Sequence, residues 1–267
     1  MKKVFFIFIF LIIAAKFCFA GVSVIGELTQ EKSVKPGDTL EGIILLKNTG
    51  KSPSEVKVYK TDYLFYSDGK VIYGEPGSVR RSNAPWLSLS PNRLTVHPEE
   101  TVPVNFTVKV PERLDFQGTY WSMVMVEPLA ETKPESIKEG KGNDKIGIQT
   151  IVRYGVQIVT DIGITGTRKI RFLDKKLISE GRNKVLQVDI ENIGERWLSP
   201  FVWVELYNEE GTLLQRLESG RQRIYPGCSV RHKLDFTKVP RGKYKALVIA
   251  DNEAETVFGA QYDVQVE

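Results

Sequence analysis

The sequence predicts an all-β fold of two β-sandwiches in tandem. Short alternating segments separated by turn residues recur along the chain, and no segment keeps a helical period for long. A set of motifs also occurs twice in the same order: Asn-X-Gly after one strand, X-Pro before another, then Val-Pro and Gly-X-Tyr. The two copies are Asn48–Gly50, His97–Pro98, Val110–Pro111 and Gly118–Tyr120, followed by Asn192–Gly194, Tyr225–Pro226, Val239–Pro240 and Gly242–Tyr244. A repeated order of this kind is typical of two homologous domains.

The first 20 residues have the pattern of a secretory signal. A basic start precedes the apolar run Val4–Ala15, which is too short to span a bilayer, and small residues precede a cleavage site after Ala20. A retained anchor is one alternative, although Lys16 interrupts the apolar run. Lipid attachment at Cys18 is another, but the charged and bulky residues before it do not suit that modification. We therefore predict export across the inner membrane.

Composition limits the classes of partner and the source of stability. Three of the 37 basic residues lie in the signal, so the remaining chain nearly balances its 33 acidic residues. A chain with almost no net charge is not predicted to bind nucleic acid. After cleavage Cys228 is the one cysteine, which excludes an intramolecular disulfide. Stability must come from the two hydrophobic cores.

The first domain is predicted over residues 21–163, with an irregular start at 22–25. The strict period of two over 102–110 places one face in the core and the other in water. Strands are predicted within 40–46, 56–65, 71–73, 86–96, 102–110 and 118–126. Residues 129–145 are rich in Glu, Lys, Pro and Gly, and we predict a mobile loop there.

The last strand of the first domain is predicted to follow this loop. Ile146 to Ile162 alternates as one long strand, and the first sandwich needs a final strand, whereas the second has its own set from Ile170. The second domain is therefore predicted over 164–267. Its strands are expected within 170–173, 185–190, 201–206, 244–250 and 262–266. The strand at Phe201 and Trp203 is predicted to be buried on both faces.

The sequence contains no motif that predicts catalysis, a metal or a cofactor. His97 and His232 are expected in different domains without neighbouring ligands, which favours structural roles. Cys228 lies four residues before His232 at a turn, too far along a strand for contact. The acidic pairs Glu99–Glu100 and Glu209–Glu210 lie at predicted turns, where contact with solvent accounts for the charged residues. A glycosidase would need two carboxylates that face each other across a cleft. We predict that the protein is not an enzyme.

A binding surface is therefore the remaining candidate for function. The start of the long strand adjoins the predicted loop, so part of it is expected to project as an exposed edge that pairs with an extended partner. Ile146, Ile148 and Val152 are predicted to contact that partner, together with Arg153 and Tyr154. Arg153 points to the face opposite Val152 and Tyr154. The alternative is a plain last strand covered by its own sheet.

The chain resembles two groups of immunoglobulin-like envelope proteins. One is the Gram-positive surface proteins that bind peptidoglycan and proteins of the WxL class. The other is the periplasmic pilus-assembly chaperones, which have two immunoglobulin-like domains and a long loop before the last strand of the first. The motifs that carry the resemblance are Trp86–Pro91, Val96–Glu100, Val108–Pro111, Gly118–Trp121 and Ile151–Val156.

The resemblance to the chaperones implies a basic pair in the cleft between the domains, which holds the terminal carboxylate of a subunit. In this sequence residues 21–30 contain no Lys or Arg, so Arg153 is the one candidate for that role. Val159–Asp161 also replaces the usual Tyr-Arg-Pro ending of the strand.

Our functional hypothesis is a non-enzymatic, chaperone-like protein in the periplasm or at the cell surface. It would assist the assembly or attachment of secreted, surface or pilin-like proteins by binding an extended strand. The alternative is a module that binds peptidoglycan.

Overall fold

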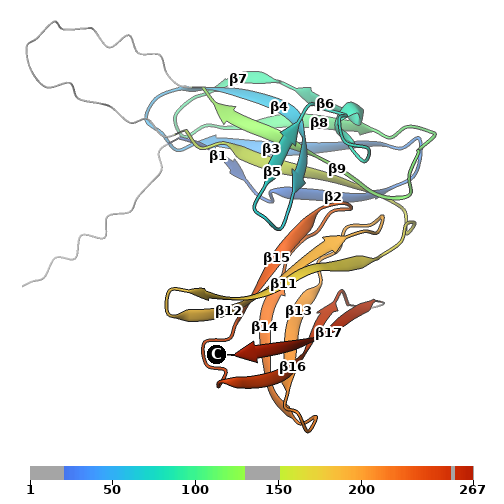
Figure 1. Cartoon of the computed structure of the whole chain (residues 1–267). Coiled ribbons are helices and arrows are strands. Elements are labelled where there is room, and N and C mark those ends of the chain that lie inside the picture. The colour runs from blue at the N-terminus through green and yellow to red at the C-terminus, as the bar shows by residue number, and fades with distance from the viewer. Residues whose placement is uncertain (1–20, 130–150, 254–255, 267) are drawn as a thin grey trace, which may run out of the picture.

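The structure is a computed structural model that describes residues 21–129, 151–253 and 256–266. Two groups of strands form two β-sandwiches, the first above the second in Figure 1. The prediction of an all-β fold with two tandem immunoglobulin-like sandwiches is confirmed. The predicted signal 1–20 and most of the predicted loop 129–145 lie outside the described residues, as do Ile146 and Ile148.

The first domain contains two sheets whose strand orders are β1-β3-β8-β6 and β2-β10-β9-β4-β5, with β7 also paired to β4. The elements are β1 (Val22–Ile25), β2 (Thr29–Val34), β3 (Thr39–Asn48), β4 (Ser54–Phe65), β5 (Val71–Gly74), the 3-10 helix η1 (Ala84–Trp86), β6 (Leu87–Ser90), β7 (Arg93–Val96), β8 (Thr101–Lys109), β9 (Gly118–Pro128) and β10 (Tyr154–Ile162). Strands β1 and β2 together replace the single first strand of an immunoglobulin sandwich. The chain crosses from one sheet to the other between them.

The second domain has a three-stranded sheet, β11-β12-β15, and a four-stranded sheet, β14-β13-β16-β17. The strands are β11 (Ile170–Glu180), β12 (Asn183–Asn192), β13 (Phe201–Tyr207), β14 (Leu213–Arg221), β15 (Ser229–Asp235), β16 (Gly242–Asp251) and β17 (Val257–Val266). The prediction that β13 is buried on both faces is wrong. Val202, Val204 and Leu206 form its buried face, whereas Phe201 and Trp203 are partly exposed because they face outward.

The repeated Asn-X-Gly motif builds the same hydrogen-bond network in each domain. In the first, the buried Asn48 donates from Nδ2 to the carbonyl oxygens of Ser52 at 2.8 Å and Val96 at 2.9 Å. Its Oδ1 accepts the N–H of Gly50 at 2.8 Å. Each polar atom of the amide therefore has a partner, as burial requires.

The second copy repeats these bonds at Asn192. Its Nδ2 donates to the carbonyl oxygens of Arg196 at 2.7 Å and Ile224 at 2.9 Å, and its Oδ1 accepts the N–H of Gly194 at 2.9 Å. A Cβ on Gly194 would come within 2.6 Å of the carbonyl oxygen of Thr167, so only glycine fits. In both domains the network ties the end of one strand to the chain that leads into another. This explains why the motifs keep their order.

The Gly-X-Tyr motif forms a tyrosine corner in each domain. The Tyr120 hydroxyl donates to the carbonyl oxygen of Phe116 at 3.0 Å and accepts the N–H of the same residue at 2.9 Å. The Tyr244 hydroxyl donates to the carbonyl oxygen of Pro240 at 2.9 Å. Both motifs thus fix the loop that precedes a central strand.

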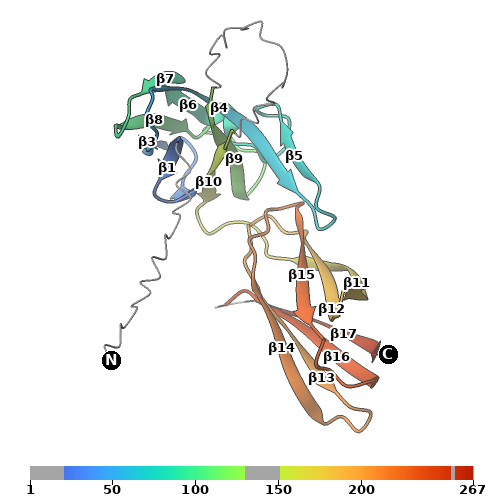
Figure 2. The same ribbon diagram turned by 90° about the vertical axis from the view of Figure 1, so that its left-hand side faces the viewer.

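The two cores meet at the joint between the domains. Trp121 and Val159 come from the first domain, yet both belong to the hydrophobic cluster of the second. The Trp121 ring stacks on that of Tyr225, with centroids 4.8 Å apart and planes 7° apart. The β4–β5 hairpin also reaches the second domain (Figure 2), where the Ser67 N–H donates to Ser229 Oγ at 2.9 Å. The second domain therefore covers part of the outer face of the first.

We expect Asn192→Ala to lower the free energy of unfolding by about 2 to 4 kcal/mol, because it removes three hydrogen bonds that one fully buried side chain makes. Chemical denaturation measures the change. The control is Asn208→Ala, which removes an exposed turn bond to the Thr212 N–H and should cost less than about 1 kcal/mol. Equal small effects in both variants would show that the network is not needed.

His232 predicts a pH dependence of stability. The residue is fully buried, its Nδ1 is 3.1 Å from Ser219 Oγ, and burial lowers its pKa from 6.5 to about 4. The unfolded chain therefore binds a proton more readily than the folded one between these values. Stability should be complete above pH 6.5 and should decrease by up to about 3 kcal/mol as the pH falls towards 4.

Unfolding free energies of the protein and of His232→Leu, measured between pH 7 and 4, test this prediction. In the variant, the free energy of unfolding should decrease less steeply as the pH falls. An identical slope in both proteins would exclude His232 as its source.

Candidate functional site

The side chains with potential for catalysis or metal binding lie apart or buried in the described residues. They contain no cluster of three or more His, Cys, Asp or Glu side chains that could hold an ion. Cys228 and His232 are both fully buried, and burial raises the pKa of the Cys228 thiol to about 12. His97 lies in an exposed turn, where its backbone N–H donates to Glu100 Oε2 at 2.8 Å. These placements fit the structural roles predicted for them.

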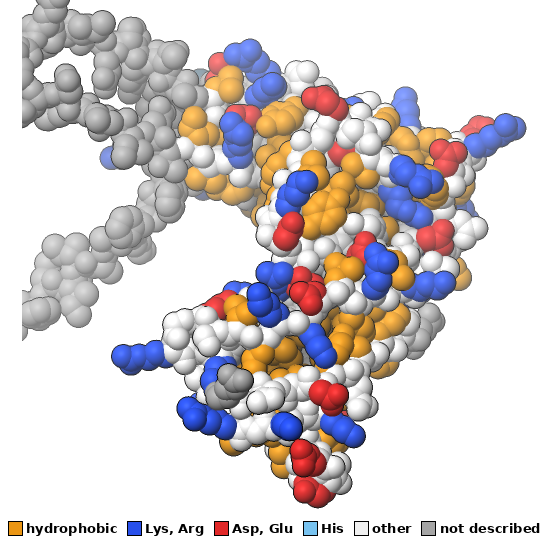
Figure 3. All heavy atoms as spheres, in the orientation of Figure 1, with side chains coloured by type: hydrophobic (Ala, Val, Ile, Leu, Met, Phe, Trp, Pro, Cys, Tyr) orange, Lys and Arg blue, Asp and Glu red, His pale blue; other side chains and the backbone are white. Residues whose placement is uncertain are grey.

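The exposed surface carries both signs of charge. Figure 3 shows Lys, Arg, Asp and Glu side chains mixed over the visible face, with hydrophobic side chains gathered on the first domain and near the joint. In the described part of the chain no helix has the length and apolar character needed to cross a bilayer. The visible face therefore has no large patch of a single charge that would attract an oppositely charged partner.

The predicted strand from Ile146 begins later than expected. In the structure β10 starts at Tyr154, and the three residues before it, including Val152 and Arg153, are not in a strand. Val152 therefore does not share a strand face with Tyr154. Gly155, the second residue of β10, weakens the strand near its start, because glycine adds no side chain to stabilise it.

Strand β10 has a neighbour on both sides along only part of its length. On one side it pairs with β9 from Tyr154 to Ile162. On the other side β2 pairs with it in parallel from Gln157 to Ile162. Among the described strands, none covers the second side of Tyr154–Val156. We call this segment the open edge.

Gly155 carries the free backbone groups of the open edge. The N–H of Gln157 donates to Leu28 at 2.8 Å and that of Gly163 to Val34 at 2.9 Å, so the odd-numbered residues face β2. By the same alternation the N–H and C=O of Gly155 point beyond the start of β2, towards the open side. These are the groups that an added strand would use.

Apolar and charged side chains flank the open edge. Ile151 and Val152 are 43% and 40% exposed. Tyr154 packs against the core of the first domain. Arg153 turns to the outer face, where its Nη2 lies 2.7 Å from Glu127 Oε1. An incoming strand would thus meet exposed apolar groups beside a paired charge.

The crossing from β1 to β2 leaves a second half-edge on β3, but this one is protected. Strand β1 pairs with β3 only as far as Ile25 and Leu45. Beyond that point Gln30 Nε2 donates to the carbonyl oxygen of Ile43 at 3.0 Å. The exposed charge of Glu41 follows on the same strand. Charged residues and side-chain caps discourage pairing at an edge, so β10 offers the better docking site.

The joint between the domains carries acidic groups where the resemblance implied a basic pair. Glu31 of β2 and Asp161 of β10 both accept hydrogen bonds from Trp197 Nε1, at 2.9 and 3.1 Å. Arg223 Nη1 lies 2.9 Å from Glu31 Oε2, and Arg196 Nη2 lies 3.5 Å from Asp161 Oδ2. Burial raises the pKa of Glu31, and its pairing with Arg223 opposes the shift.

Arg153 lies at the other end of β10 from these groups, beside Glu127. The structure therefore does not bring it into the joint. One hint of the joint's charge is present in the sequence, since residues 21–30 contain no cation and Glu31 follows them.

We expect Val152→Lys and Val156→Lys to differ sharply in stability, although the residues are four apart. Val156 is fully buried, so the new charge should lower the free energy of unfolding by about 3 to 5 kcal/mol. Val152 is exposed, and its change should cost less than about 1 kcal/mol. Thermal melts measure both. A large loss of stability in Val152→Lys would show that Val152 lies in the core and not on the open surface.

Comparison with known proteins gives a likeness at low identity. No protein-family model and no curated protein sequence matches the chain. The class 5 fimbriae chaperone CfaA is 10% identical with a TM-score of 0.48, over 92% of this chain and 100% of that chain. A chain of the CsuC–CsuE chaperone–tip adhesion subunit complex from Acinetobacter baumannii is 11% identical with a TM-score of 0.48, over 91% and 98%. The E. coli chaperone DraB is 11% identical with a TM-score of 0.43, over 92% and 98%.

Proposed function

We propose that this protein is an exported, non-enzymatic, chaperone-like protein that binds an extended strand of a secreted or surface protein at the open edge of β10. The observation that carries the proposal is the uncovered segment Tyr154–Val156, where β2 does not reach. Unpaired backbone groups at a sheet edge are a template for another chain. Strand addition satisfies them and places alternate side chains of the partner on each face.

The surroundings of the open edge support an apolar strand as the partner. Ile151 and Val152 expose apolar surface directly before β10. A partner strand that continues past Tyr154 would bury part of this surface, which stabilises the complex by about 25 cal/mol per Å². The pilin-like nature of the partner is what the sequence resemblance implies.

The joint does not support anchoring of a partner's terminal carboxylate. Arg223 and Arg196 are the cations nearest to Glu31 and Asp161, and both already pair with these carboxylates. A third carboxylate would compete with two internal ones. Our proposal therefore places partner binding at the open edge. The proposed location is the periplasm or the cell surface, as the predicted signal implies.

Retention of partners from an envelope extract tests this function. We expect immobilised protein to retain an exported protein and Val152→Lys to retain about tenfold less, equivalent to about 1.4 kcal/mol. Leu213→Lys is the matched control, because Leu213 is 51% exposed on β14 of the second domain. It should retain as much as the unchanged protein.

Two results would contradict the proposal. One is equal retention by both lysine variants, which would place the partner away from the open edge. The other is sedimentation with purified, protein-free peptidoglycan that neither variant affects, which would favour the glycan-binding alternative.

A further inference from the structure

The second domain holds the same β10 residues that bind β2 through their backbones. Gln157, Val159 and Asp161 face β2 with their N–H and C=O groups. Their side chains point to the second domain. The Gln157 side chain accepts a hydrogen bond from the Tyr225 hydroxyl, and Val159 belongs to the second domain's hydrophobic cluster. Asp161 accepts the Trp197 indole N–H at 3.1 Å.

The second domain also holds β2 itself, through Glu31. Trp197 Nε1 donates to Glu31 as well as to Asp161, so a single N–H bridges the two strands. The Arg223 guanidinium lies 3.7 Å from the centre of the Trp197 ring and pairs with Glu31 at 2.9 Å. Stacking on Trp197 and ion pairing with Glu31 thus both hold the Arg223 guanidinium in place. We call Glu31, Asp161, Trp197 and Arg223 the clasp.

Within the first domain, strand β2 is held by its backbone pairing with β10, by Val34 in the core and by the bond from Gln30 to the carbonyl oxygen of Ile43. It is six residues long with the polar sequence TQEKSV, and only Val34 is buried in the core. Within the described sheet it pairs with β10 alone, and the pairing is parallel. Short parallel edge strands are among the less stable pairings. The position of β2 on β10 therefore depends on the second domain.

We propose that the second domain positions the docking edge, by holding β2 on β10 and so fixing the open edge at Tyr154–Val156. Loosening the clasp would let β2 leave β10 and would extend the open edge towards Val159. The second domain would thereby determine the length of partner strand that the first domain accepts. The effect on the length of the partner strand rests on the proposed function. The effect of the clasp on the pairing of β2 with β10 can be measured without a partner.

Trp197→Phe is the sharpest probe of the clasp. It removes the N–H that bridges Glu31 and Asp161 and keeps an aromatic ring beneath Arg223. The matched control is Trp203→Phe on β13. Trp203 Nε1 donates to Glu205 at 3.2 Å, and Arg216 lies 4.2 Å above its ring, all within the second domain. The control therefore loses an equivalent bond far from β2.

Amide hydrogen exchange measured by NMR reports the result residue by residue. We expect the amides of Gln157, Val159 and Asp161 in Trp197→Phe to exchange at least about tenfold faster than in the unchanged protein. The amides of Ile158 and Thr160 face β9 and should change much less. The Trp203→Phe control should leave both sets unchanged.

Two outcomes would overturn the proposal. Equal acceleration of both sets of amides would mean general loosening of the domain, and no acceleration would mean that β2 is held without the clasp. Because no partner is present, these failures are distinct from a failure of the retention test.

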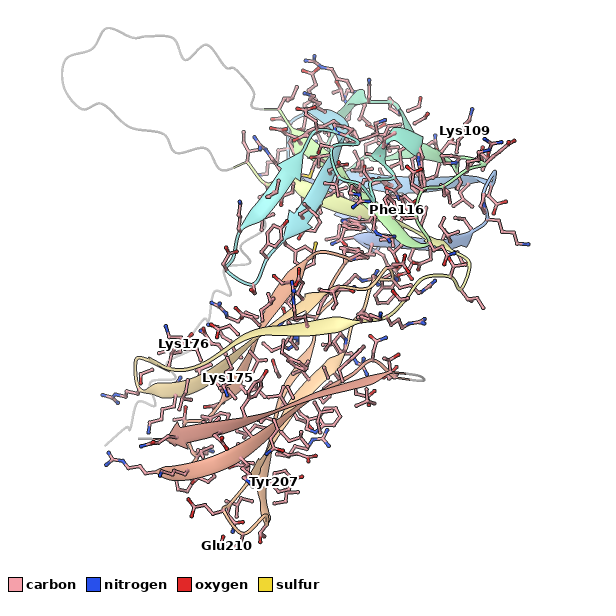
Figure 4. The ribbon with its side chains drawn as sticks, turned by 45° about the vertical axis from the view of Figure 1, so that its right-hand side comes forward. Lys109, Phe116, Lys175, Lys176, Tyr207 and Glu210 are labelled. Carbon is pink, nitrogen blue, oxygen red and sulfur yellow. The ribbon has the colours of Figure 1, made fainter. Side chains whose placement is uncertain are left out.

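A second, milder pair of variants covers the case in which Trp197→Phe does not fold. Tyr225→Phe removes only the hydroxyl that donates to Gln157. Its control, Tyr207→Phe, removes a hydroxyl that donates to Glu205 at 2.7 Å, at the tip of the second domain farthest from the first (Figure 4). Faster exchange at Gln157 in the first variant alone supports the proposal. Unchanged exchange in both contradicts it.

Discussion

The crossing of the first strand from one sheet to the other is the constraint on which this structure depends. A sandwich has open edges where its two sheets end, and one strand can cover only half of each when it changes sheet. Strand β1 covers part of β3, and β2 covers part of β10. Among the described strands, this crossing leaves two half-edges uncovered, one on β3 and one on β10. The side chain of Gln30 blocks the one on β3, whereas Gly155 leaves the one on β10 accessible.

The joint between the domains shows how a charged cluster can be stable in a partly buried place. Glu31 and Asp161 would repel each other if they stood alone, and burial of either would be unfavourable. Trp197 donates to both, while Arg223 and Arg196 supply the opposite charges. The Trp121 ring stacks on that of Tyr225, and the Arg223 guanidinium lies 6.0 Å from the centre of the Tyr225 ring. The first domain therefore contributes the two acids and the second contributes most of their donors, while the Thr119 hydroxyl of the first domain also donates to Asp161.

Much of the fold could be predicted from local patterns. The alternation of residues 102–110 appears as β8, and the repeated motifs appear as two equivalent networks around Asn48 and Asn192. Strands β2 and β14 were not predicted, because TQEKSV and LLQRLESGR lack the alternation of a half-buried strand. The start of β10 was placed too early, since the apolar period continues upstream of Gly155 while the described pairing does not.

The sequence by itself determined the all-β class and the two-domain repeat, because the Asn-X-Gly and Gly-X-Tyr motifs make short-range bonds that leave a local signature. It also indicated β10 as the strand of interest. Only the tertiary structure decided which part of β10 is open, since that depends on where β2 begins to pair with it. The same holds for the joint, where Glu31 contacts Trp197 and Arg223 across 166 and 192 residues. Contacts of that range depend on how the folded domains pack, which no local pattern records.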